Sequence, residues 1–145
     1  MLLDQAATTR EAVNMLQKYD VQSSAGKPYH FFISDTSGET VIVDWPDQTM
    51  NVLDHEAATN FQLSPGKTCG EGIGHSRFKK LKAGLEKSKK DSGMTPAQAM
   101  DLLEEVSIKW NGEWQTEWSV VYHLDDFSLD ICNDMNYAKV HHFKD

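Results

Sequence analysis

The chain has 145 residues, of which 39% are hydrophobic and 25% charged, the composition of an ordinary globular protein, and this length predicts a single domain over residues 1–145. Its 14 basic and 22 acidic residues give a net charge of −8, which disfavours nucleic acid and anionic membranes as partners, because both are bound by basic surfaces. No stretch approaches the roughly 20 apolar residues of a membrane span. The N-terminus MLLDQAATTREAV shows no signal-peptide pattern, so we expect a cytoplasmic protein.

The first predicted element is a helix over residues 9–19. Thr8 and Glu11 have the spacing of a capping box. The residues on one helical face are Ala12, Met15, Leu16 and Tyr19. The segment 23–28 is polar and contains glycine and proline, so we predict a loop there.

A run of strands is predicted next. Residues 29–34 and 40–45 are rich in aromatic and β-branched side chains, and the turn-forming residues 35–38 between them predict a hairpin. Residues 50–53 are predicted to form a third strand, and residues 58–61 are a candidate fourth.

A glycine-rich loop follows and leads into two predicted helices. The first helix covers residues 76–88. The second begins at Thr95, which is a good N-cap, with Pro96 in the first turn and Gln98 at capping-box spacing. Three further strands are predicted at residues 116–123, 127–132 and 138–143.

The predicted order is therefore one helix, three or four strands, two helices and three strands. Short links between consecutive strands favour mainly antiparallel pairing. We therefore predict an α+β fold in which helices cover antiparallel sheets.

The sequence gives no strong signal for a metal or a cofactor. His141 and His142 are neighbours on a predicted strand, where successive side chains point to opposite faces, so the two cannot chelate one ion together. No set of His, Cys, Asp and Glu has the spacing of a zinc site, so we expect no metal and no cofactor. Cys69 and Cys132 do not make a disulfide framework, and Cys132 is expected to be a small buried residue.

Asn60 and Arg77 have ordinary structural interpretations. Most asparagines at a strand end satisfy local backbone groups only. Arg77 opens a helix and could anchor a carboxylate such as Glu71. On these interpretations the chain is a non-catalytic α+β binding or assembly module, which is the alternative to the hypothesis that follows.

Several short motifs in a fixed order favour a catalytic hypothesis. The motifs are E-A at 11–12, I-S-D-T-S-G-E at 33–39, T-N-F at 59–61, the glycine-rich loop after it, S-R-F at 76–78 and T-E-W-S-V-V-Y at 116–122. Together they resemble the C-terminal half of the choloylglycine hydrolase and penicillin acyltransferase group, which are linear-amide C–N hydrolases of the N-terminal-nucleophile superfamily. The resemblance covers nearly the whole chain.

The resemblance implies a fold and a mechanism. The family fold is a four-layer αββα sandwich, of which this chain would form part. An N-terminal cysteine attacks an amide carbonyl, and its own α-amine acts as the base. Asn60 matches the family's asparagine that donates to the developing oxyanion, and Arg77 matches the arginine that supports the nucleophile. These two are the candidate catalytic residues.

The family's nucleophile has no counterpart in this sequence. Cys69 is not N-terminal and has no free amine to activate it. The resemblance therefore implies that the chain alone is inactive towards its small-molecule amide substrate. It also predicts a homodimer, or pairing with a separate N-terminal half, because dividing such a fold exposes apolar sheet surface.

Overall fold

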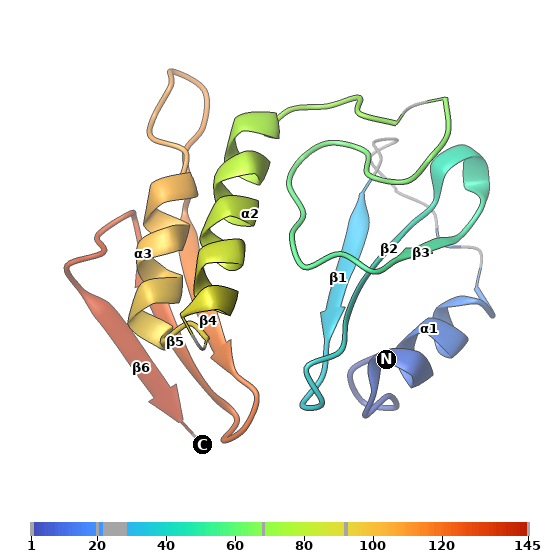
Figure 1. The fold of residues 1–145 in the computed structure, drawn as a ribbon, viewed down its shortest axis with the longest axis horizontal. Coiled ribbons are helices and arrows are strands. Elements are labelled where there is room, and N and C mark those ends of the chain that lie inside the picture. Colours follow the sequence, from blue (N-terminus) through green and yellow to red (C-terminus); the bar gives the residue numbers. More distant parts are fainter. Residues whose placement is uncertain (1, 20, 22–28, 68, 92, 145) are drawn as a thin grey trace. The chain divides into compact units, whose positions relative to one another are not determined.

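A computed structural model of the protein describes residues 2–19, 21, 29–67, 69–91 and 93–144 (Figure 1). The chain divides into two compact units, Met1–Phe78 and Lys79–Asp145, and each is described by itself. That residues 1–145 form a single domain stays a prediction. The loop predicted at 23–28 lies outside the described residues. Within the described ranges, no helix is long and apolar enough to cross a membrane.

The predicted α+β class is confirmed. The described strands form two antiparallel three-stranded sheets, with the orders β1-β2-β3 and β4-β5-β6. The elements in chain order are α1 (Thr9–Leu16), β1 (His30–Ser34), β2 (Thr40–Asp44), the 3-10 turn η1 (Pro46–Gln48), β3 (Asn51–Leu53), α2 (His75–Lys90), α3 (Pro96–Val106), β4 (Trp118–His123), β5 (Ser128–Asn133) and β6 (Val140–Lys144).

Helix α1 begins where the sequence predicts and ends earlier. The Thr8 hydroxyl accepts a hydrogen bond from the Glu11 backbone N–H at 3.2 Å, which caps the N-terminus. At the other end, the amides of Lys18 and Tyr19 bond to carbonyls three residues back, so the last turn tightens and the helix stops at Leu16. The Tyr19 side chain is 64% exposed, so it is not part of the buried face.

The core of the first unit lies between α1 and one face of its sheet. Val41 and Val43 alternate along β2, and both are buried together with Leu16 of α1. Phe31 and Ile33 of β1 stand opposite these valines and pack against the same cluster. Ile42 and Asp44, on the other face of β2, are also buried, so β2 is covered on both faces.

A buried carboxylate fastens the segment after β3 to the sheet. The side chain of Asp44 at the end of β2 has no exposed area. It accepts hydrogen bonds from Gln62 Nε2 at 2.5 Å and from the Ser64 hydroxyl. These donors satisfy a buried polar group that would otherwise be costly, and they fix the segment that carries Asn60.

The candidate fourth strand at 58–61 does not form. Among the described residues, one β-bridge joins this segment to the loop, between Phe61 and Gly72. Gly72 has a φ of +123°, which lies outside the range of a regular strand. A Cβ at this position would lie 2.3 Å from the Asn60 carbonyl oxygen, so the two segments pack here only because residue 72 is glycine.

In the second unit, α2 and α3 run side by side (Figure 1). Helix α3 has the predicted capping box, in which Thr95 and Gln98 bond to each other's backbone, and Pro96 occupies its first turn. Gly84 of α2 allows the close approach, because a Cβ there would lie 2.7 Å from Leu102 Cδ1.

The two faces of the β4-β5-β6 sheet differ sharply. Ser119 and Cys132 are paired across β4 and β5, and both are buried. Burial of Cys132 was predicted and is confirmed, and it raises the pKa of the Cys132 thiol. Trp118, Tyr122 and Phe143 lie on the opposite face and are 64%, 68% and 57% exposed.

Candidate functional site

Asn60 and Arg77 meet in the first unit. Arg77 Nη2 donates a hydrogen bond to Asn60 Oδ1 at 2.6 Å, although the two residues are 17 positions apart. Both residues matched family motifs in the sequence, and the structure places their side chains in contact. Among the described residues, the partner of the Arg77 guanidinium is Asn60, and no ion pair joins Arg77 to Glu71.

Backbone pairing and aromatic packing hold Asn60 beside α2. The Ile73 N–H donates to the Asn60 carbonyl at 2.9 Å, next to the bridge at Phe61. The Phe61 ring stacks on His75 at a centroid distance of 4.1 Å and meets Phe78 edge-on at 5.2 Å. His75 and Phe78 flank Arg77 on the first turn of α2. The contacts of the Phe61 ring with these two side chains therefore place the neighbouring Asn60 beside Arg77.

Gly74 leaves room for the arginine. Its φ is +98°, and a Cβ added there would lie 2.8 Å from Arg77 Nη2 and 3.1 Å from Thr59 Cβ. The Thr59 hydroxyl donates to the Gly74 carbonyl at 3.2 Å, which ties the two sides of the loop together. Gly74 is therefore needed here for close packing.

The contact fixes the direction of the Asn60 amide. A guanidinium can only donate hydrogen bonds, so the amide oxygen must face Arg77 and the two Nδ2 hydrogens must point elsewhere. Asn60 is exposed, and among the described residues Nδ2 has no hydrogen-bond partner. Partial burial lowers the pKa of Arg77 from its ordinary value. The Arg77 guanidinium therefore orients Asn60 so that its Nδ2 donor group points away from the arginine.

Comparisons of the chain with protein-family models, with curated proteins and with solved structures find no significant match.

The two thiols differ in accessibility. Cys69 is exposed, and Cys132 is buried, so only Cys69 is open to reagents. The Cys69 sulfur lies 4.0 Å from the Leu63 carbonyl oxygen, which is a weak contact. Cys132, with its raised pKa, is a poor nucleophile because the thiolate is the reactive form.

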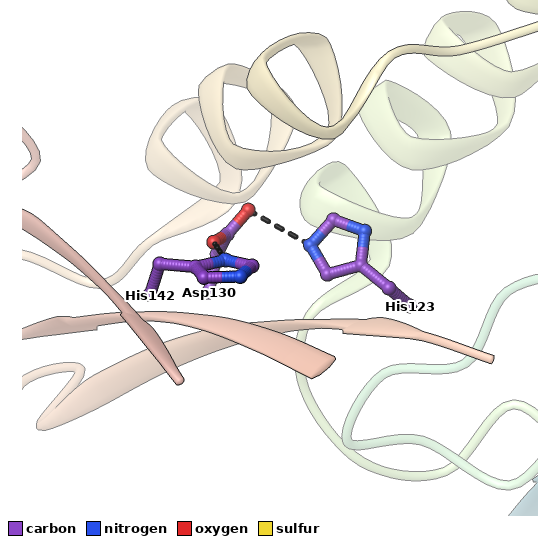
Figure 2. Close-up of side chains that lie close together, drawn as sticks. All are labelled: His123, Asp130 and His142. Atoms are coloured by element: carbon purple, nitrogen blue, oxygen red, sulfur yellow. Dashed lines mark hydrogen bonds and ion pairs between the residues drawn. The ribbon is translucent and has the colours of Figure 1, made fainter. Parts of the chain in front are cut away.

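A second polar cluster, which the sequence did not reveal, lies in the second unit. Asp130 bridges two imidazoles: its Oδ2 lies 2.9 Å from His123 Nε2, and its Oδ1 lies 2.7 Å from His142 Nδ1 (Figure 2). The three side chains rise from the same face of the β4-β5-β6 sheet, on the side of the helices (Figure 2). His141, the neighbour of His142, is not part of the cluster.

Strand register is the signal that could have located this cluster. Asp130 pairs with Val121 on β4 and with His142 on β6, so these three residues lie on the same face of the sheet. His123 is two residues beyond Val121 on that face. A search for ligands at short sequence spacing misses such a set, because its members come from three strands.

Proposed function

We propose that this chain supplies the asparagine and arginine of the active site of a linear-amide C–N hydrolase, similar to the choloylglycine hydrolase and penicillin acyltransferase group. The observation that carries the proposal is the hydrogen bond of 2.6 Å from Arg77 to Asn60. Two motif residues that the resemblance assigns to one catalytic centre lie in contact, and the contact orients the amide donor.

Each residue has a role that follows from its chemistry. When a nucleophile attacks an amide carbonyl, negative charge develops on the oxygen, and a fixed donor stabilises it. Asn60 Nδ2 is such a donor, held in place because its oxygen is occupied by Arg77. The Arg77 guanidinium adds positive charge, which favours the thiolate form of a nearby cysteine.

The proposal includes the family's αββα arrangement. In each unit a three-stranded antiparallel sheet accompanies helices, α1 in the first and α2 with α3 in the second, which is the composition that two outer and two inner layers require. The substrate class is a small molecule with a linear amide bond, such as a conjugated bile salt or an acylated amine.

The nucleophile in this proposal is an N-terminal cysteine from a segment that is not among the 145 residues of this sequence. Neither Cys69 nor Cys132 is N-terminal, and the latter is buried. The exposed side chains of Trp118, Tyr122 and Phe143 on one sheet face are suited to association with that segment. Size-exclusion chromatography of the chain with and without an N-terminal half tests this partner. A well-folded monomer that binds neither the half nor a second copy contradicts it.

The test of the catalytic role is an amide-hydrolysis assay on the chain combined with an N-terminal half that begins with cysteine. We expect Asn60→Ala to lower kcat by about 10²- to 10³-fold with little change in KM, because the donor acts on charge that exists only in the transition state. Asn14→Ala, at an exposed position of α1, is the matched control and should leave kcat unchanged.

Arg77→Met should shift the reaction to higher pH, because the thiolate loses a neighbouring cation. Arg10→Met removes the other arginine of the sequence, exposed on α1, and should leave the pH profile unchanged. Equal rates for the Asn60 variant, the Arg77 variant and their controls would contradict the proposed function.

A further inference from the structure

We propose that His123, Asp130 and His142 form a binding site for a divalent transition-metal ion of the Zn²⁺ class. The proposal concerns the second unit only and stands independently of amide hydrolysis. Two imidazoles and one carboxylate are the donor set of many three-ligand metal sites in which further positions are filled by water or another ligand.

The sheet places the three side chains without help from a loop. His123 ends β4, while Asp130 and His142 are paired in the middle of β5 and β6. Each strand is hydrogen-bonded to its neighbour in regular register, so the three backbone positions are fixed relative to one another. Sites on strands hold their ligands more rigidly than sites on loops.

The distances suit a small ion after a small adjustment. One candidate ligand atom from each side chain can be chosen so that all lie within 4.8 Å of one another. Around Zn²⁺, with bonds of roughly 2.0–2.2 Å, neighbouring ligand atoms are about 3.4 Å apart. The present contacts of 2.9 Å and 2.7 Å to Asp130 would therefore open by about half an ångström, and the widest separation, up to 4.8 Å, would close, both by side-chain rotation.

The charge of the cluster favours a cation. Asp130 is the acidic member of the cluster, and its carboxylate oxygens are direct ligands for a cation. Lys144, a basic residue on the same face of β6, is paired with Asp126 at 2.7 Å. The cluster therefore presents a carboxylate between two imidazoles.

The site is shielded on one side and open on the other. The side chains of His123 and Asp130 are each 21% exposed, and that of His142 is 57% exposed. An ion can reach the cluster from the side of His142, and water can complete its coordination.

Isothermal titration of the metal-stripped full chain with Zn²⁺ tests the proposal, and Co²⁺ absorption reports the coordination geometry. We expect one ion per chain. His123→Ala, Asp130→Ala and His142→Ala should each lower the affinity by at least about 100-fold, since even the loss of an outer-shell partner costs 10- to 100-fold. Circular dichroism of each variant establishes that the sheet persists, and His142→Asn is the milder replacement if His142→Ala unfolds.

His141→Ala is the matched control. It removes a histidine from the same strand, one position away and on the opposite face, so it should leave the affinity unchanged. Two results would overturn the proposal. One is the absence of saturable Zn²⁺ binding by the native chain. The other is binding that survives in the folded His123, Asp130 and His142 variants, which would place the ion elsewhere.

Discussion

The contact between Asn60 and Arg77 depends on a residue without a side chain. Gly74 lies between Thr59 and the guanidinium, where a Cβ would approach Arg77 Nη2 to 2.8 Å. Its φ of +98° is also a conformation that L-residues adopt only under strain. Two separate costs therefore oppose any replacement of Gly74, one from the backbone and one from its neighbours.

We predict that Gly74→Ala destabilises the protein more than Gly112→Ala does. Gly112 has the same φ of +98°, but a Cβ there meets nothing within 4 Å, so this control carries the backbone cost alone. We expect about 1 kcal/mol for the control and about 2–3 kcal/mol for Gly74→Ala, measured by urea denaturation. Equal losses would mean that the space around Arg77 adapts freely.

The sequence predicted one cluster of polar residues and missed another. The pair of Asn60 and Arg77 was accessible because each belongs to a short motif with a fixed order along the chain. The cluster of His123, Asp130 and His142 was not predicted, because its members come from three strands and lie together only through the pairing register of those strands. A shift of one residue in a single pairing would send a histidine to the other face, and no local pattern fixes that register.

At the scale of elements, one carboxylate joins helix α1 to the first hairpin. Asp35, in the turn between β1 and β2, accepts hydrogen bonds from the Thr9 N–H at 2.8 Å and from the Thr9 hydroxyl at 3.0 Å. It also accepts two from Ser37, which close the turn. All four donors favour the ionised form, so they hold the pKa of Asp35 well below its usual value of 3.8.

This arrangement predicts a loss of stability in acid. A carboxyl group with a depressed pKa in the folded state contributes stability above its unfolded pKa, near 3.8, and loses that stability as pH falls towards the folded value. Urea denaturation between pH 7 and pH 2 should show that Asp35→Asn destabilises the protein near neutral pH, with a difference from the native chain that shrinks below about pH 4.

Asp101→Asn, on the exposed face of α3, is the control and should give little difference from the native chain at any pH. A stability difference for Asp35→Asn that is constant with pH would show that the charge of Asp35 is not what joins α1 to the hairpin.

Elements with strong local signals were predicted closely. The capping box at Thr95 predicted the start of α3, and the hairpin predicted from residue types and the turn at 35–38 is present as β1 and β2. The candidate strand at 58–61 is wrong: a single bridge joins Phe61 to Gly72, and Gly72 has a φ of +123°, outside the range of a regular strand. Local propensity says nothing about a close approach between segments that are distant in sequence.

On the scale of the whole molecule, each unit contains one cysteine. Cys69 belongs to Met1–Phe78 and is exposed, while Cys132 belongs to Lys79–Asp145 and has no exposed area. The rate of reaction with a thiol reagent therefore differs between the two units. Replacing the accessible cysteine, Cys69, also tests whether the nucleophile comes from this chain or from an N-terminal half.

We predict that one thiol per native chain reacts rapidly with a disulfide reagent and that the second reacts only as the protein unfolds. In a Cys69→Ala variant, labelling of Cys132 should follow the urea unfolding curve, because a fully buried thiol must be exposed before it reacts. The same variant, combined with an N-terminal half, should hydrolyse a linear amide as fast as the native chain does, because the proposed nucleophile is not Cys69. Loss of turnover in folded Cys69→Ala would assign the chemistry to this thiol and remove the need for an external one.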